Sequence, residues 1–314
     1  MTDAVLEPTK PVFRRLTLIG IGLIGSSIAR GARAKGLAEE IVISTRREET
    51  LERARALGLG DRYCLDPAEA VEGADCVIVS VPVGASGAVA AAIADHLARH
   101  AIVSDVGSVK ADVVRQMAPH LPAHARFVPA HPVAGTEHSG PDAGFAELFE
   151  NKWCIVTPPE GAEPEAVETL VAFWRGLGSK VETMSPEHHD MVLAITSHIP
   201  HLIAYNIVGT AADLEKVSES EVIKFSAGGF RDFTRIAASD PTMWRDVFLH
   251  NREAVLEMLG RFIEDLFVLQ RAVRFGDGEK LFEHFTRTRA IRRGILDLGQ
   301  DTTAPDFGRV PKKD

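Results

Sequence analysis

Cysteine is scarce in this sequence of 314 residues, and none of its three cysteines belongs to a Cys-x-x-Cys pair. Cys64, Cys76 and Cys154 are odd in number and far apart along the chain, a pattern that suits a reducing compartment. A signal peptide is also missing, because the first ten residues contain no apolar stretch. We therefore expect a cytoplasmic protein.

Two further features are lacking, and each excludes a class of partner. No apolar run approaches the roughly 18 to 20 residues that span a bilayer, so we expect no membrane partner. Positive charge is not in excess, because 35 Lys and Arg stand against 44 Asp and Glu. A nucleic-acid surface needs clustered cations, so we expect no nucleic-acid partner.

A glycine-rich turn, Gly20-Ile-Gly22-Leu-Ile-Gly25, stands between an expected strand at 15–20 and an expected helix at 26–36. In this context the Gly-x-Gly-x-x-Gly pattern predicts a dinucleotide site. Gly20 permits the tight turn, Gly22 lets a pyrophosphate approach the backbone, and Gly25 allows close packing of helix on strand. The cofactor residues that we expect around this turn are Gly20, Gly22, Leu23, Ile24, Gly25, Val81 and Pro82.

Short apolar runs alternate with segments of helical spacing in the first half of the chain. After the glycine turn these runs fall at 41–45, 75–81, 101–105, 126–129 and 153–157. Continuous apolar strands separated by helices indicate a parallel sheet that is covered on both faces. We therefore predict an α/β Rossmann-type dinucleotide-binding domain over residues 12–185.

From about residue 186 apolar positions recur at helical spacing and β-rich runs disappear. We predict an all-α helical domain over 186–300 for substrate binding and dimerisation, and flexible tails at 1–11 and 301–314. The apolar surface of 240–275 is wider than one amphipathic stripe, which indicates burial within the domain and against a second subunit. A homodimer is the expected assembly.

The residues about 20 positions beyond the glycine turn indicate which dinucleotide binds. A carboxylate there would bind the ribose hydroxyls of NAD, but this chain has Thr45. Arg46 and Arg47 follow, and a guanidinium can bind a 2′-phosphate through two hydrogen bonds. The pattern favours NADP over NAD, although the two arginines could instead pair with Glu48 and Glu49 on a solvated helix face.

Three further segments carry polar residues in otherwise apolar or turn-like surroundings: DVGSVK at 105–110, HPVAGTE at 131–137 and SHIPH at 197–201. Ser108 and His131 both fall just past the carboxyl ends of expected parallel strands. Open α/β sheets gather their ligands at that edge. We therefore expect both side chains beside the nicotinamide, with Ser108 in contact with the cofactor.

The sequence resembles the prephenate and arogenate dehydrogenases, also called cyclohexadienyl dehydrogenases, of tyrosine biosynthesis. The resemblance rests on six ordered segments, which are GIGLIGSS at 20–27, DVGSVK at 105–110, HPVAGTEHSGPDAG at 131–144, EHHD at 187–190, SHIPH at 197–201 and SAGGFRDFTRIAASDPTMW at 226–244. The resemblance implies oxidative decarboxylation of a small cyclohexadiene substrate, in which a ring hydroxyl loses its proton, the same carbon gives hydride to the nicotinamide, and carbon dioxide leaves. No metal is required.

By this resemblance His131 is the catalytic base or hydrogen-bond acceptor, and Ser108 bridges the substrate hydroxyl and the imidazole. A neutral imidazole suits proton removal near neutral pH. Arg235 binds substrate carboxylate. The other residues that the resemblance places in or at the edge of the substrate pocket are His198, His201, Thr136, Glu137 and, more weakly, His189.

Simpler interpretations remain open for several of these residues. His198 and His201 are three apart and could hold a metal, but Pro200 lies between them and no third ligand is evident. Asp105 and Lys110 are consistent with an ion pair or a turn. Trp244 is consistent with the core.

Two other functions remain as alternatives. A β-hydroxyacid-type dehydrogenase would need a catalytic lysine in the helical domain, and the surroundings of Lys224 do not resemble such a site. A non-catalytic dinucleotide-sensing regulator would have lost Ser108, His131 and Arg235, which are all present. The sequence leaves the choice between prephenate and arogenate open.

Overall fold

The computed structural model describes residues 10–136, 138–218 and 223–297. The chain divides into two compact units, Met1–Met258 and Leu259–Asp314. The predicted boundary between residues 185 and 186 separates the α/β part from the all-α part, and it does not coincide with the division into compact units. It stays a prediction. Of the predicted tails, all but residues 10 and 11 lie outside the described residues.

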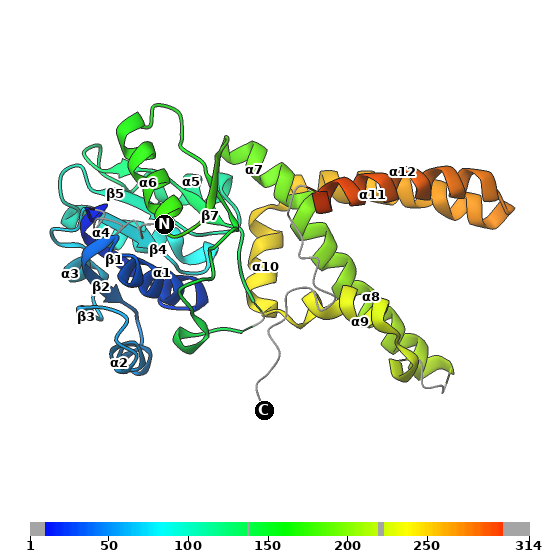
Figure 1. The fold of residues 1–314 in the computed structure, drawn as a ribbon, viewed down its shortest axis with the longest axis horizontal. Coiled ribbons are helices and arrows are strands. Elements are labelled where there is room, and N and C mark those ends of the chain that lie inside the picture. The colour runs from blue at the N-terminus through cyan, green and yellow to red at the C-terminus, as the bar shows by residue number, and fades with distance from the viewer. Residues whose placement is uncertain (1–9, 137, 219–222, 298–314) are drawn as a thin grey trace, which may run out of the picture. The chain divides into compact units, whose positions relative to one another are not determined.

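A six-stranded parallel sheet forms the centre of the first unit, in the order β3-β2-β1-β4-β5-β6 (Figure 1). This order is typical of a Rossmann fold, and its direction reverses between β1 and β4. Leu18 of β1 lies between Ile43 of β2 and Ile78 of β4. The strands are β1 (Phe13–Ile19), β2 (Ala38–Ser44), β3 (Arg62–Cys64), β4 (Cys76–Val79), β5 (Ile102–Asp105) and β6 (Arg126–Phe127).

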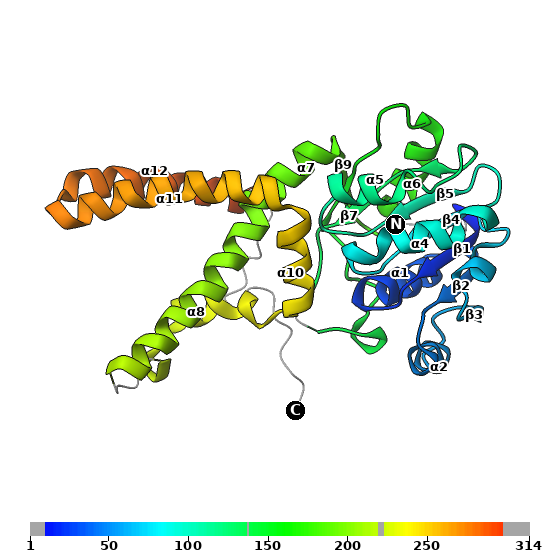
Figure 2. The ribbon, with the colours of Figure 1, turned by 180° about the vertical axis from the view of Figure 1, so that it is seen from behind.

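Helices cover both faces of this sheet, as the apolar strands predict. Ile28 of α1, Leu51 of α2 and Trp174 of α6 belong to the apolar cluster on one face. Val71 of α3, Ile93 of α4 and Met117 of α5 belong to the cluster on the other, and Figure 2 shows the molecule from behind. The helices are α1 (Leu23–Ala34), α2 (Glu48–Ala56), α3 (Pro67–Val71), α4 (Ser86–Ile93), α5 (Ala111–Met117) and α6 (Pro164–Gly176), with 3-10 turns η1 (Val83–Ala85), η2 (Ala94–His96) and η3 (Pro141–Ala143).

A second sheet of three strands lies beside the first and corrects one expectation. Its strands are β7 (Ala130–Pro132), β8 (Trp153–Val156) and β9 (Lys180–Thr183), in the order β7-β8-β9. The run at 153–157 was expected in the parallel sheet, and this was wrong, because β8 pairs antiparallel with β7. His131 pairs with Ile155 and therefore lies within a strand of its own, not just beyond the preceding one.

The described residues beyond 186 contain helices and no strand, which confirms the predicted all-α part. Ser185 caps the first of these helices, and Asp240 caps the later helix that begins at Pro241. The elements are α7 (Pro186–Leu193), the π-helical turn η4 (Ala194–His198), α8 (Ile199–Ser218), η5 (Ile223–Phe225), α9 (Gly228–Thr234), η6 (Arg235–Ala238), α10 (Pro241–His250), α11 (Arg252–Phe275) and α12 (Gly278–Asp297).

The continuous helical segment Pro186–Glu215 is long and apolar enough to cross a membrane by length and composition alone. Three of its polar side chains, His189, Asp190 and His198, are nevertheless buried inside the first unit. They make hydrogen bonds there to other parts of the chain. The segment therefore packs against protein on this side.

The second unit is a helical hairpin made of the later turns of α11 and of α12 (Figure 2). The turn between them uses Gly276 with φ +66°, and the Asp277 N–H donates to the Ala272 carbonyl over 2.9 Å. Many large apolar side chains of this unit are exposed: Ile263, Leu266, Phe267, Val268, Val273, Phe275, Phe282, Phe285 and Ile291. A face of this kind is typical of a protein interface.

Candidate active site

The glycine turn has the geometry that a dinucleotide needs. Gly20 has φ +93°, and a Cβ there would lie 2.3 Å from the carbonyl oxygen of Ser80. A Cβ on Gly25 would lie 2.3 Å from the carbonyl oxygen of Gly20, so helix and strand pack closely here. A Cβ on Gly22 would meet nothing within 4 Å, which leaves this backbone open to a ligand.

Helix α1 begins at Leu23, and its N-cap residue Gly22 supplies no side-chain hydrogen bond. The backbone N–H groups of its first turn, which includes Leu23 and Ile24, therefore remain available for a phosphate. Val81 and Pro82 follow β4, on the other side of the point where the strand order reverses. The residues present thus fit a dinucleotide across this edge of the sheet.

The three residues predicted to select the cofactor follow β2 at the same edge. Thr45 is half-buried, whereas Arg46 and Arg47 are exposed. Glu48 and Glu49 open helix α2 next to them. Among the described contacts neither arginine has an ion-pair partner, so both guanidinium groups can turn toward a ligand.

A chain of buried polar side chains leads into the protein from His131. His131 is 8% exposed, and its Nδ1 lies 2.8 Å from Nε2 of His189. Nδ1 of His189 lies 2.8 Å from Oδ1 of Asp190. The carboxylate of Asp190 also accepts the backbone N–H groups of Lys110 and Ala111, over 2.7 and 2.9 Å. Nε2 of His131 makes no hydrogen bond to any described residue, and this atom is available to a ligand.

A buried ion pair supports the strand that carries His131. Lys110 Nζ donates to Oδ2 of Asp105 over 2.5 Å and to the carbonyl oxygen of Ala130 over 2.7 Å. The same carboxylate oxygen accepts the N–H of Gly107 over 2.7 Å. Lys110 and Asp105 are 0% and 1% exposed, so removal of either partner would leave an uncompensated buried charge. Of the two interpretations of these residues, the structure shows the ion pair.

A second histidine cluster lies around Trp244. Nδ2 of Asn251 donates to the carbonyl oxygen of Asp190 over 2.9 Å and lies 3.1 Å from Nδ1 of His198. The ring of His201 stacks on Trp244 with centroids 3.6 Å apart. Nε2 of His198 and Nε1 of Trp244 are buried without a hydrogen-bond partner among the described residues. Buried polar nitrogen atoms of this kind suit the binding of a polar substrate.

Burial keeps the histidines of the site neutral. Desolvation, assisted by His189 and Lys110, holds the pKa of His131 well below its usual value. Burial lowers the pKa of His189 to about 2 and that of His198 to about 4. Burial also lowers the pKa of His201, and the charge of Arg235 adds to this shift.

The remaining predicted residues lie in three places. Ser108 is half-buried between β5 and α5, and it makes no hydrogen bond to His131. Thr136 is exposed, and its Oγ1 accepts the N–H of His138 over 3.2 Å. Arg235 is exposed at the start of η6. Glu137 lies outside the described residues.

Sequence reasoning missed Asp190 and Asn251 as members of this site. Asp190 directly follows His189 in EHHD, so a polar pair in a mostly apolar segment was an available signal. Asn251 had no such signal, because it meets Asp190 and His198 only through the fold. Among the described residues no group of three or more His, Cys, Asp or Glu side chains could hold a metal ion.

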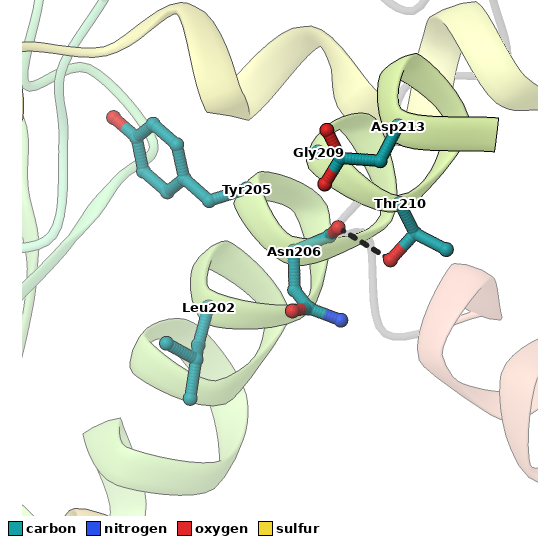
Figure 3. A pocket seen from close by; sticks show the side chains of 6 residues that line it. All are labelled: Leu202, Tyr205, Asn206, Gly209, Thr210 and Asp213. Atoms are coloured by element: carbon teal, nitrogen blue, oxygen red, sulfur yellow. Dashed lines mark hydrogen bonds between the residues drawn. The ribbon is translucent and has the colours of Figure 1, made fainter. Parts of the chain in front are cut away.

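One open cavity of about 420 Å³ lies along α8, lined by Leu202, Tyr205, Asn206, Gly209, Thr210 and Asp213 (Figure 3). All six residues come from successive turns of that helix, and none is a predicted site residue. Thr210 Oγ1 donates to the carbonyl oxygen of Asn206 over 3.0 Å, so this hydroxyl is used within the helix. A cavity with one helix as its wall lacks the converging polar groups of the cluster around His131.

Family models match most of the chain. The nucleotide-binding domain of prephenate dehydrogenase matches residues 28–183, and the dimerization domain of prephenate dehydrogenase matches residues 185–287. The chain belongs to the prephenate dehydrogenase family. The family, the enzyme class and the fold class expected from the sequence are thereby confirmed.

Curated and solved relatives agree with this family. A cyclohexadienyl dehydrogenase from Zymomonas mobilis is 45% identical over 90% of this chain and 97% of its own length. A prephenate dehydrogenase from Bacillus subtilis is 35% identical over 93% of this chain and 78% of its own. A solved prephenate dehydrogenase from Aquifex aeolicus, in complex with hydroxyphenyl propionate and NAD+, has a TM-score of 0.84 and 33% identity, covering 90% of this chain and 98% of the other.

Proposed function

We propose that this chain catalyses the oxidative decarboxylation of prephenate to 4-hydroxyphenylpyruvate, of arogenate to tyrosine, or of both. The observation that carries the proposal is the geometry of His131, a buried neutral imidazole. Its Nδ1 is hydrogen-bonded to His189, and its Nε2 makes no hydrogen bond to any described residue and can accept one from a ligand. Family membership and the Zymomonas mobilis cyclohexadienyl dehydrogenase support it.

In the proposed reaction Nε2 of His131 takes the proton of the ring hydroxyl, with Ser108 holding that hydroxyl in place. A bound nicotinamide supplies the hydride acceptor for the ring carbon. The bond to the ring carboxylate breaks, its electron pair completes the aromatic ring, and carbon dioxide leaves. The proton held by His131 returns to the phenolate oxygen, so one substrate and one oxidised cofactor give one phenol, one carbon dioxide and one reduced cofactor.

We assign the substrate's carboxylates and polar groups to cationic and donor side chains. Arg235 has an exposed guanidinium without an ion-pair partner among the described residues, and its charge acts on His201. His198 offers a buried Nε2 without a partner. We keep Thr136 and Glu137 as the proposed edge of the pocket. We reassign His189 from the pocket to a role behind His131, because its Nε2 is hydrogen-bonded to Nδ1 of His131.

We propose NADP as the preferred cofactor over NAD. The support is the pair Arg46 and Arg47, exposed beyond β2, together with Thr45 in place of an acid. The Aquifex aeolicus relative was solved with NAD+, so NAD remains the alternative. The proposed assembly is a homodimer with small-molecule substrates and no metal. A dimerization-domain match and the exposed apolar side chains of α11 and α12 support the dimer.

The test measures kcat/KM for prephenate and arogenate, each with NAD and with NADP, from the absorbance of the reduced cofactor. We expect turnover in at least one combination and a higher kcat/KM with NADP for the preferred substrate. A preference for NAD would refute the cofactor proposal alone. Absence of turnover in all four combinations would refute the activity.

A further inference from the structure

The hydrogen bonds between His131, His189 and Asp190 determine which ring nitrogen of each histidine carries the hydrogen. Asp190 is the innermost of these three side chains, and its two carboxylate oxygens accept the N–H groups of Lys110 and Ala111. Burial raises the pKa of the Asp190 carboxyl, whereas these two N–H donors and the charge of Lys110 favour its ionised form. Because both carboxylate oxygens already accept N–H groups, Asp190 is the acceptor in its contact with His189. The 2.8 Å contact between Oδ1 of Asp190 and Nδ1 of His189 therefore requires the hydrogen of His189 to be on Nδ1.

The assignment of His189 fixes that of His131. A neutral imidazole carries one ring hydrogen, so Nε2 of His189 has a lone pair and accepts. Nδ1 of His131, 2.8 Å away, must then be the donor. Because His131 is also neutral, its Nε2 carries no hydrogen and presents a lone pair.

We infer that Asp190 and His189 are positioning residues that hold His131 in its Nδ1–H tautomer, with the Nε2 lone pair turned to the substrate hydroxyl. This inference rests on the proposed function. The opposite tautomer would present an N–H group, which cannot accept the hydroxyl proton. The positioning residues therefore act on catalysis through His131 and not by touching the substrate.

Asn251 connects Asp190 to a second imidazole, that of His198. This contact favours the tautomer of His198 that is opposite to the tautomer of His131. The amide Nδ2 of Asn251 donates to the carbonyl oxygen of Asp190 and faces Nδ1 of His198, and Asn251 is 4% exposed. If Nδ1 of His198 accepts this amide, the hydrogen of His198 is on Nε2. That atom is buried without a partner among the described residues. The network thus gives His131 an acceptor and His198 a donor.

The direct test is the tautomer of His131 in the full chain at neutral pH, with no substrate present. The chain is labelled with 15N in its histidine rings, and the His131 signals are identified by their loss in His131→Asn. We expect Nδ1 to carry the hydrogen and Nε2 to show the shift of an unprotonated ring nitrogen. A hydrogen on Nε2 would overturn the inference. The readout needs no turnover, so it separates failure of this inference from failure of the proposed function.

Variants at His189 add a kinetic test. In His189→Leu nothing accepts from Nδ1 of His131, and we expect kcat to fall by about 100-fold, within the usual range for general-base help, with KM changed by less than about threefold. In His189→Gln the amide oxygen can take the place of the accepting nitrogen, and we expect kcat to stay within about tenfold of the wild type.

His124→Leu is the control, because it makes the same substitution at a histidine whose Nε2 contacts a backbone carbonyl, that of Leu97, away from the site. It should leave kcat unchanged. An unchanged kcat in His189→Leu, or equal losses in His189→Leu and His189→Gln, would contradict the positioning role. If His189→Leu does not fold, the ring-nitrogen signals of the wild type still decide the question.

Discussion

The protonation of His131 sets the pH dependence of the reaction at the residue scale. Burial is the largest cause of its low pKa, and the charges of His189, Lys110 and His198 lower the pKa further. Its ring contacts His189, which in turn contacts Asp190. The neutral form is the active one, so activity is lost as pH falls through this pKa. Because the pKa is lowered, that loss occurs below about 6.5, the usual imidazole value.

The measurement is kcat/KM against pH for the substrate and cofactor pair with the highest turnover. We expect a plateau that continues from neutral pH to below about 6.5 before the acid limb begins. Stability is followed in parallel by thermal unfolding, so that acid unfolding is not mistaken for titration. An acid limb centred at or above the usual imidazole value would contradict a buried neutral base.

The candidate site could be predicted from the sequence only in part. Ser108 and His131 follow expected strands, and short motifs with fixed spacing identify them. Asp190 meets the N–H of Lys110 across 80 positions of sequence, and Asn251 meets His198 across 53. Such partners depend on how distant elements pack, which local pattern does not encode.

At the scale of elements, the sequence predicted the strands that contain an apolar run and missed those that lack one, which are β3, β7 and β9. Strands β7 and β9 have three and four residues, and β9 is mostly polar and exposed. Neither has the apolar run that identified β1 or β4. The missed strand β7 matters most, because it carries His131 and pairs it with Ile155.

The exposed apolar faces of α11 and α12 lead to a prediction about assembly. We expect the protein to sediment with the mass of two chains, because so many exposed large apolar side chains are unfavourable in water. Phe267 is 61% exposed on α11. Phe267→Glu should shift the protein toward the mass of one chain at low micromolar concentration.

Leu65→Glu is the control for this assembly test, because Leu65 is an exposed apolar residue of the α/β part, at 44%. It should leave the sedimented mass unchanged. A wild-type mass of one chain over the same concentrations would contradict the homodimer. The comparison separates loss of a specific interface from the general effect of an added charge.

At the scale of the whole molecule, the order of secondary structure was predictable because apolar residues are spaced differently in the two parts of the sequence. Alternating strands and helices indicated the parallel sheet, and helical spacing indicated the part beyond residue 186. The division into Met1–Met258 and Leu259–Asp314 was not predictable. It depends on which helices share buried contacts and not on a change in sequence pattern.

The central claim is that this chain couples decarboxylation to hydride transfer through His131. The direct measurement follows carbon dioxide and reduced cofactor together, for the wild type and for His131→Asn, with the preferred substrate and cofactor. We predict equal amounts of both products from the wild type and a kcat at least about 100-fold lower in His131→Asn, with cofactor affinity little changed. Near-normal turnover in His131→Asn, or reduced cofactor formed without carbon dioxide, would contradict the claim.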